Sequence, residues 1–220
     1  MVIPSSRYEP VMFGTYEMEL HEVIERLVAT GFRTIVNCGA GRGYYALGLA
    51  VRCPNAQVIA FETRAQLRAD LERAARANGV GHRVVIGGTC NAAVLRECLA
   101  SACRPVLVLA DIEGSELQTF DRDTVRELTH ATVLIETHDD WVLGTTEQLL
   151  RRFARTHRAE AYLSRDRTRR DLPRALASGP WRALSWVLVR MMREPRFPHQ
   201  QWVLFTPSRA EGGREDAFDC

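Results

Sequence analysis

A strand-like run followed by closely spaced glycines constrains the fold of this 220-residue chain more than any other feature. Residues 34–38 are mostly apolar, and Gly39, Gly41 and Gly43 follow them at alternate positions. Beyond the glycines, apolar residues recur with helical spacing from Ala46 onward. Glycines let the backbone pass close to a ligand, and the first N–H groups of a helix have no partner inside it. The pattern therefore predicts a strand, a ligand-binding turn and a helix.

An acidic residue after the second expected strand narrows the choice of ligand. Glu62 follows the strand-like run 57–61, about twenty residues beyond the glycines, where a carboxylate can accept hydrogen bonds from ribose hydroxyls. A dinucleotide-binding turn would have its third glycine at position 44, which Tyr44 occupies. NAD and S-adenosylmethionine (SAM) both contain a ribose, but a compact turn with no pyrophosphate to accommodate favours SAM.

Strand-like and helix-like patterns alternate along most of the chain. Helices are expected at 16–30, 64–77 and 145–157. The expected strands are 34–38, 57–61, 83–86, 105–110, 131–136, 159–164 and 201–205. Alternation of this kind predicts a parallel sheet with right-handed crossovers, with ligands at the carboxyl ends of the strands.

Short motifs spread over about residues 32–140 indicate a family. They lie at residues 36–45, 58–63, 78–79, 109–116 and 134–138, and Asp-Ile-Glu-Gly-Ser-Glu at 111–116 is the most distinctive of them. In these motifs the chain resembles class I SAM-dependent methyltransferases, most of all their FkbM-like branch. The resemblance implies an α/β fold with a Rossmann-like, seven-stranded, mostly parallel sheet, helices on both faces and an antiparallel last strand.

Two positions depart from the pattern of that family. Asn37 stands where an acidic residue usually precedes the first glycine, and Thr63 stands where a proline is common. Asn37 can form a hydrogen bond but offers no carboxylate to the amino group of the methionine moiety. The residues expected to contact SAM are Asn37, Gly39, Gly41, Gly43, Glu62, Thr89, Asn91 and Asp111.

The sulfonium charge of SAM already activates its methyl group, so the protein has to orient the acceptor and, for a hydroxyl, help remove a proton. Asp111, at the end of the fourth strand, is expected to position or deprotonate the acceptor, although it could simply cap the turn that follows it. His138 is the second expected catalytic residue, because an imidazole with a pKa of about 6.5 suits proton transfer near neutrality. Glu116 is expected to start a helix.

Three further residues are expected to contact the substrate, namely Glu113, Asp139 and Trp181. Asp111, His138 and Asp139 could instead hold a divalent cation that lowers the pKa of an acceptor hydroxyl. Acidic residues at strand ends are common in this architecture, so no metal is the favoured prediction.

The region between the last two strands is longer than a minimal fold of this kind needs. All 29 basic residues are arginine, and residues 151–196 contain 13 of them against 4 acidic residues. The insertion, at about 165–200, is expected to be a lid that grips an anionic acceptor or else a contact between two copies of the chain. Residues 1–31 are expected to form a helical segment, 32–207 the methyltransferase domain and 208–220 a flexible tail.

These observations predict a methyltransferase that transfers a methyl group from SAM to a small-molecule acceptor, with a hydroxyl oxygen implied by the resemblance. Two alternatives remain: a nucleic-acid (RNA) methyltransferase that uses the arginine-rich 151–196 region, and a non-catalytic nucleotide-binding protein. The chain shows no recognisable RNA-binding module, so nucleic acid is the less favoured partner. No signal-peptide core and no apolar run of about 20 residues is visible, so a cytoplasmic protein without membrane contact is expected. A homodimer is compatible with the sequence.

Overall fold

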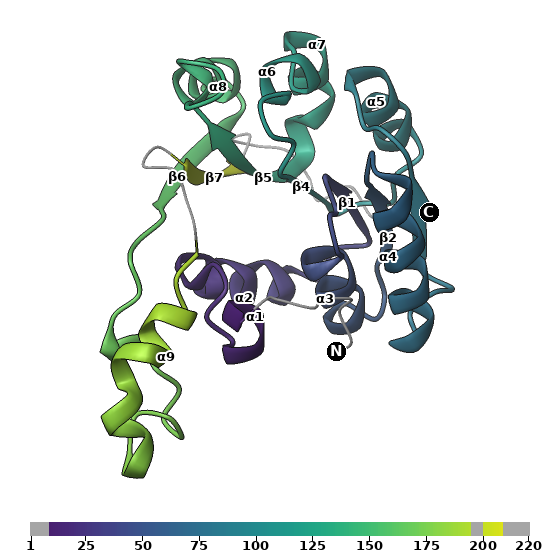
Figure 1. Cartoon of the computed structure of the whole chain (residues 1–220). Coiled ribbons are helices and arrows are strands. Elements are labelled where there is room, and N and C mark those ends of the chain that lie inside the picture. Colours follow the sequence, from purple (N-terminus) through teal and green to yellow (C-terminus); the bar gives the residue numbers. More distant parts are fainter. Residues whose placement is uncertain (1–8, 195–199, 209–220) are drawn as a thin grey trace.

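A seven-stranded sheet organises the computed structural model, which describes residues 9–194 and 200–208 (Figure 1). Its strands are β1 (Thr34–Cys38), β2 (Gln57–Phe61), β3 (Val84–Gly87), β4 (Val106–Ala110), β5 (Ala131–His138), β6 (His157–Leu163) and β7 (Gln200–Pro207). Their order across the sheet is β3-β2-β1-β4-β5-β7-β6. The pairs among β1 to β5 are parallel, whereas β7 runs antiparallel to both β5 and β6. The predicted fold class is confirmed.

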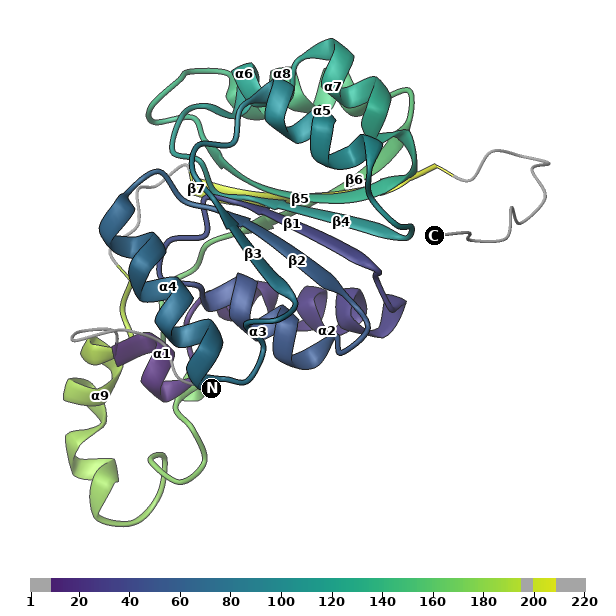
Figure 2. The ribbon, with the colours of Figure 1, turned by 90° about the vertical axis from the view of Figure 1, so that its right-hand side faces the viewer.

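Helices cover both faces of the sheet (Figure 2). One face carries α2 (His21–Thr30), α3 (Tyr44–Arg52) and α4 (Ala65–Ala77), and the other carries α5 (Ala92–Ala100), α6 (Glu116–Thr119), α7 (Arg122–Glu127) and α8 (Thr145–Phe153). Successive residues of a strand point to opposite faces, so Leu107 and Leu109 pack in the first layer while Val108 packs in the second. All five residues of β4 are buried, as expected for a central parallel strand covered on both sides.

The strands agree with the sequence prediction to within two or three residues, but the N-terminal region differs. A short helix, α1 (Glu9–Phe13), was not predicted, and the expected helix at 16–30 begins as a 3₁₀ helix at Met18–Leu20 before α2. Gly31 ends α2 in the left-handed conformation (φ 76°). The strand expected at 131–136 continues to His138, because pairing with β7 supports two more residues. None of the helices in the described ranges is long and apolar enough to cross a membrane.

Residues 164–194, called the extra segment below, leave the sheet after β6. They contain 3₁₀ helices at Arg169–Asp171 and Gly179–Leu184 and the helix α9 (Ser185–Met191), which lies beside α1 (Figures 1 and 2). Leu172, Leu188 and Met192 form a small buried cluster against Phe13 of α1. The end of the expected insertion (195–199) and the expected tail from 209 onward lie outside the described residues.

Candidate functional site

The glycine turn lies between β1 and α3, and its conformation explains why glycine is needed there. Gly39, Gly41 and Gly43 have φ values of 80°, 52° and 88°, which disfavour any residue with a side chain. A Cβ on Gly39 would lie 1.7 Å from the backbone oxygen of Asp111, and one on Gly43 would lie 2.4 Å from Leu71 Cδ1. Around Gly41 there is open space. Two of the three glycines therefore serve close packing, and Gly41 borders an open space.

A cleft of about 310 Å³ opens beside this turn, at the carboxyl ends of β1 and β4. Among the predicted site residues it is lined by Asn37, Gly39, Gly41, Asp111 and Glu113. The other lining residues are Val11, Tyr16, Ala40, Arg42, Tyr44, Tyr45, Arg64 and Leu67. The parallel register of the sheet brings the ends of β1 and β4 together, since Cys38 pairs with Ala110. The predicted methionine end of the SAM site and the predicted acceptor residue Asp111 thus share one cleft.

Asn37 is 1% exposed and lies on the wall of this cleft. Its Nδ2 group donates a long hydrogen bond of 3.4 Å to the carbonyl oxygen of Leu109. Its Oδ1 atom has no hydrogen-bond partner among the described residues. Buried polar atoms are nearly always hydrogen-bonded, so an unpaired acceptor on a cleft wall indicates a place for a ligand donor.

Glu62 is 5% exposed and is held by the chain around it. Its Oε2 accepts a hydrogen bond from the backbone N–H of Gly41 at 2.9 Å, and its Oε1 accepts from the backbone N–H of Arg64 at 2.9 Å. The carboxylate therefore holds the glycine turn in place. Oε1 also accepts from Arg64 Nε at 3.1 Å and from the hydroxyl of Thr63 at 3.5 Å. An oxygen of a carboxylate has about two lone-pair positions, so Oε2 keeps one for the predicted ribose contact, which stays a prediction.

Three of the other predicted residues have structural roles or lie elsewhere. Asn91 caps α5, with its Oδ1 accepting from the N–H of Val94 at 3.0 Å, and Thr89 beside it is exposed. Trp181 lies in the extra segment with 48% of its surface exposed. Neither Thr89, Asn91 nor Trp181 lines the cleft. Their predicted contacts with SAM or substrate remain untested.

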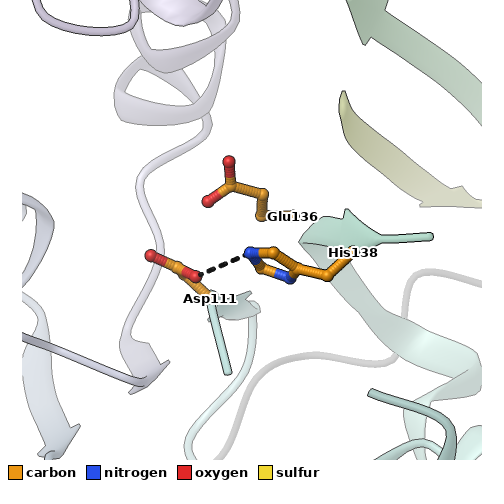
Figure 3. A group of neighbouring side chains, drawn as sticks. All are labelled: Asp111, Glu136 and His138. Atoms are coloured by element: carbon orange, nitrogen blue, oxygen red, sulfur yellow. Dashed lines mark ion pairs between the residues drawn. The ribbon is translucent and has the colours of Figure 1, made fainter. Parts of the chain in front are cut away.

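A compact group of ionisable side chains lies where β4 and β5 end. Asp111, Glu136 and His138 point toward one another, and each offers one ligand atom within 4.8 Å of the others (Figure 3). Asp111 directly follows Ala110, which pairs with Ile135, so Asp111 and Glu136 lie level on neighbouring strands. Glu136 and His138 are two residues apart on β5 and therefore face the same side of the sheet. Glu136 is 4% exposed and His138 is 2% exposed.

The ring of His138 is fixed from its other side by Glu116. The Nδ1 atom lies 2.6 Å from Glu116 Oε1, while Nε2 lies 3.6 Å from Asp111 Oδ1. Glu116 is fully buried, and the same Oε1 atom accepts from the N–H of Gly114 at 3.0 Å. A neutral ring that donates its Nδ1–H to Glu116 presents the lone pair of Nε2 to Asp111 and Glu136. As predicted, Glu116 begins a short helix, but its contact with His138 was not expected from the sequence.

The negative charges around His138 favour its protonated form. Burial disfavours the imidazolium, but the hydrogen bond to Glu116 and the negative charges of Asp111 and Glu113 outweigh it, so the pKa of His138 is raised. Asp139 faces a different way, because its carboxylate accepts hydrogen bonds from the backbone N–H and the hydroxyl of Thr146 at the start of α8. Glu136, and not Asp139, brings a ligand atom close to those of Asp111 and His138. Glu136 was not among the site residues predicted from the sequence.

Two residues that precede α2 form part of one wall of the cleft, and no pattern in the sequence predicted this. Val11 and Tyr16 line it, and the rings of Tyr16 and Tyr44 meet edge to face at 4.7 Å. The hydroxyl of Tyr45 donates to the buried carboxylate of Glu17, and the pKa of Tyr45 is raised well above its usual value by burial and by that negative charge. These contacts only become visible once the chain is folded.

Arginines of the 151–196 region lie in several places within the described ranges. Arg151, Arg152 and Arg155 line a cavity of about 600 Å³ beside α7 and α8, together with Arg122 and Arg126. This cavity shares no lining residue with the cleft beside the glycine turn. In the extra segment, Arg165 pairs with Asp171 at 2.7 Å and Arg167 is buried against two carboxylates. These arginines are divided between separate places and partners, and the alternative of a nucleic-acid methyltransferase stays a prediction.

Comparisons with known proteins support the fold. No family model matches the chain, and no curated protein is similar to it in sequence. The O-methyltransferase TomG from Streptomyces achromogenes, solved with SAM, has a TM-score of 0.55 and 14% identity, over 88% of this chain and 80% of TomG. An O-methyltransferase from Bacillus cereus in complex with SAH has a TM-score of 0.55 and 12% identity, over 87% and 81% of the two chains. A precorrin-6y C5,15-methyltransferase from Geobacter metallireducens has a TM-score of 0.51 and 11% identity, over 85% and 88%.

At these identities the likeness concerns the fold alone. The predicted Rossmann-like, mostly parallel seven-stranded sheet is confirmed, and these three methyltransferases have a similar fold. The narrower resemblance to the FkbM-like branch remains a prediction, as do the acceptor and the individual site residues.

Proposed function

We propose that this protein is a SAM-dependent methyltransferase that methylates a hydroxyl oxygen of a small-molecule acceptor. The observation that carries the proposal is the position of Asp111. This residue lines the cleft beside the glycine turn, and it also belongs to the cluster with Glu136 and His138. A methyl donor in the cleft and an acceptor at the cluster would therefore meet at one carboxylate.

The residues of the cleft fit the methionine end of SAM. The unpaired Oδ1 of Asn37 can accept a hydrogen bond from the amino group of that moiety, in place of the carboxylate common in the family. Gly41 leaves open space beside the turn, so a ligand can approach the backbone. When bound, SAM supplies a methyl group that its sulfonium charge has already activated.

The acceptor side has to orient a hydroxyl and remove its proton. The side chain of Asp111 is 36% exposed, against 2% for that of His138, so Asp111 is the member of the pair that a substrate can reach. A carboxylate there can accept the hydroxyl proton while the oxygen attacks the methyl carbon, and general-base help of this kind contributes roughly 10²–10⁴-fold. Glu116 holds His138 in place with Nε2 3.6 Å from Asp111 Oδ1, and the ring attracts that carboxylate when it is protonated.

Calorimetric titration with SAM, S-adenosylhomocysteine and NAD tests the cofactor. We expect the two SAM-type ligands to bind and NAD to give no signal. Asn37→Leu should weaken SAM binding about tenfold or more, because the loss of one hydrogen bond to a charged group costs about 1.5–3 kcal/mol. Asn37→Asp is the matched control and should bind SAM at least as well. If the protein bound NAD and neither SAM-type ligand, the proposal would be wrong.

Transfer of a radiolabelled methyl group from SAM to a panel of phenols, alcohols and hydroxy acids tests the reaction. Asp111→Asn should lose turnover while its affinity for SAM stays within a few-fold of the wild type. Equal turnover by this variant would contradict the role given to Asp111.

A further inference from the structure

We infer that Asp111, Glu136 and His138 form a binding site for a divalent cation, with Glu116 holding His138 in the orientation required. The inference rests on the proposed function only for the chemical role of the cation. The presence of the site can be tested without SAM or any acceptor. Its ligand set also differs from the Asp111, His138 and Asp139 set considered from the sequence.

The spacing of the donor atoms supports a shared metal ion. Asp111 Oδ1 and His138 Nε2 are 3.6 Å apart, which is too long for a hydrogen bond. Two ligand atoms that each lie about 2.1 Å from the same metal ion are separated by roughly 3.0–3.6 Å at ordinary coordination angles. The pair therefore has the spacing of two ligands of one ion. Glu136 brings a third atom within 4.8 Å of both.

His138 is held as metal-binding histidines are. A metal-bound histidine usually donates its other ring N–H to a carboxylate or carbonyl, which fixes the tautomer and raises the basicity of the ligand nitrogen. Glu116 Oε1 lies 2.6 Å from Nδ1 and is fully buried. The lone pair of Nε2 is thereby directed at the two other ligands, as Figure 3 shows for the ring and its neighbours.

Negative charge is concentrated around His138. The three carboxylates of Asp111, Glu116 and Glu136 surround one imidazole, and two of these carboxylates are at most 4% exposed. The second oxygen of Glu116 has no hydrogen-bond partner among the described residues. Several negative charges close together in a partly buried place attract a divalent cation.

The mixed donor set indicates which cations fit. Two carboxylate oxygens and one imidazole nitrogen suit Mn²⁺, Fe²⁺ or Zn²⁺ better than Ca²⁺, which takes six to eight oxygens. Asp111 also borders the cleft, so a hydroxyl that reached an open coordination position would become more acidic. With one oxygen of Asp111 on the cation, the other oxygen of that carboxylate could take the hydroxyl proton as the methyl group is transferred. The cation would thus prepare the acceptor for the proposed reaction.

Mn²⁺ binding to the full chain, after treatment with EDTA and dialysis, is the test. Titration followed by electron paramagnetic resonance should find one saturable site per chain. Glu136→Gln, which keeps the shape of the ligand and removes its charge, should weaken Mn²⁺ binding at least tenfold. Glu116→Gln should weaken it by about 10–100-fold although no ligand is lost, since partners behind the ligands have effects of that size. Asp123→Asn, which alters an exposed carboxylate of α7 paired with Arg126, is the control and should change nothing.

Pulsed resonance on the wild-type protein gives a second measurement that depends on no variant folding. It should detect coupling between Mn²⁺ and an imidazole nitrogen, and His138→Ala should abolish that coupling. Absence of a saturable site in the wild type, unchanged affinity in Glu136→Gln, or nitrogen coupling that persists in His138→Ala would each overturn the inference. None of these outcomes involves SAM, so the proposed function is tested separately by its own titration and transfer assay.

Discussion

The strand ends that carry the ionisable cluster and the extra segment that lies beside α1 are held in place by different kinds of contact. Around the cluster, backbone ladders join β1, β4 and β5, and the strand residues there are almost all buried. The extra segment has only a small apolar cluster, together with Arg167, whose side chain is 2% exposed. Arg167 pairs with Glu19 at 2.9 Å and with Glu194 at 2.6 Å. The ionisable cluster therefore lies on a rigid framework, whereas the position of the extra segment depends on a few polar contacts and a small apolar cluster.

The largest effect on stability is expected from adding one methyl group at Gly39, which lies against the end of β4. In Gly39→Ala, the new Cβ would overlap the backbone oxygen of Asp111, which belongs to a strand end and cannot rotate away. Overpacking costs roughly 1–3 kcal/mol or more, and the left-handed conformation adds about 1–2 kcal/mol. We expect the free energy of unfolding, measured with urea, to fall by about 5 kcal/mol.

Gly41→Ala is the matched control for this prediction. Gly41 also has a positive φ, but no atom lies within 4 Å of the added Cβ. Only the backbone cost of about 1–2 kcal/mol should be seen. Equal losses in the two variants would mean that the strand end yields to the added methyl group, and the rigid side of the comparison would be wrong.

A smaller and more local effect is expected in the extra segment. Arg167→Ala would leave Glu19 and Glu194 buried without their shared partner, and breaking a buried ion pair costs about 3–5 kcal/mol. Release of the segment limits this loss, because the two carboxylates then regain water. We expect faster tryptic cleavage after Arg169 and Arg170, while urea unfolding of the sheet changes by less than about 1 kcal/mol.

Arg165→Ala is the control for the buried arginine. Arg165 pairs with Asp171, but half of its side chain is exposed, and pairs of this kind contribute about 0–1 kcal/mol. Its tryptic cleavage rate should stay close to that of the wild type. A global loss of stability in Arg167→Ala would show that the segment and the sheet unfold together, contrary to the comparison.

The sheet could be predicted from the sequence because its signals are local. The apolar runs at 34–38 and 57–61 match β1 and β2 residue for residue, and Gly31 ends α2 as expected. Each of these signals is contained within a few neighbouring residues. Alternation of strands and helices then leaves few topologies to choose from.

The ionisable cluster could be predicted only in part, because its geometry is set by contacts between distant residues. Asp111 and His138 were selected from their places at strand ends. Glu136 was not, because its position level with Asp111 follows from the register between β4 and β5. The contact of Glu116 with His138 depends on the left-handed turn at Glu113 and Gly114, which brings the chain back to the strand ends. No spacing in the sequence reports such a return.

The smallest effect on stability is expected from Asp171, a carboxylate of the extra segment that pairs with Arg165. The Arg165 guanidinium and the N–H of Thr168 hold the pKa of Asp171 well below its usual range. A lowered pKa in the folded state stabilises the fold above the unfolded pKa of about 3.9, and the contribution is lost as the pH falls below that value. Because Arg165 is half exposed, solvent screening should keep it below about 1 kcal/mol.

Hydrogen exchange of the Thr168 amide measures this contribution, because that N–H donates to Asp171 Oδ2 at 2.7 Å. After correction for the intrinsic exchange rate, its protection should decrease from pH 5 to pH 3 in the wild type and stay constant in Asp171→Asn. The variant should also keep most of its resistance to trypsin, since Arg167 still holds Glu19 and Glu194. If trypsin cleaved Asp171→Asn as fast as Arg167→Ala, the turn at Asp171 would contribute as much to holding the segment as the buried Arg167 does. The extra segment would then be held by many weak surface contacts, and its difference from the strand ends would be one of degree.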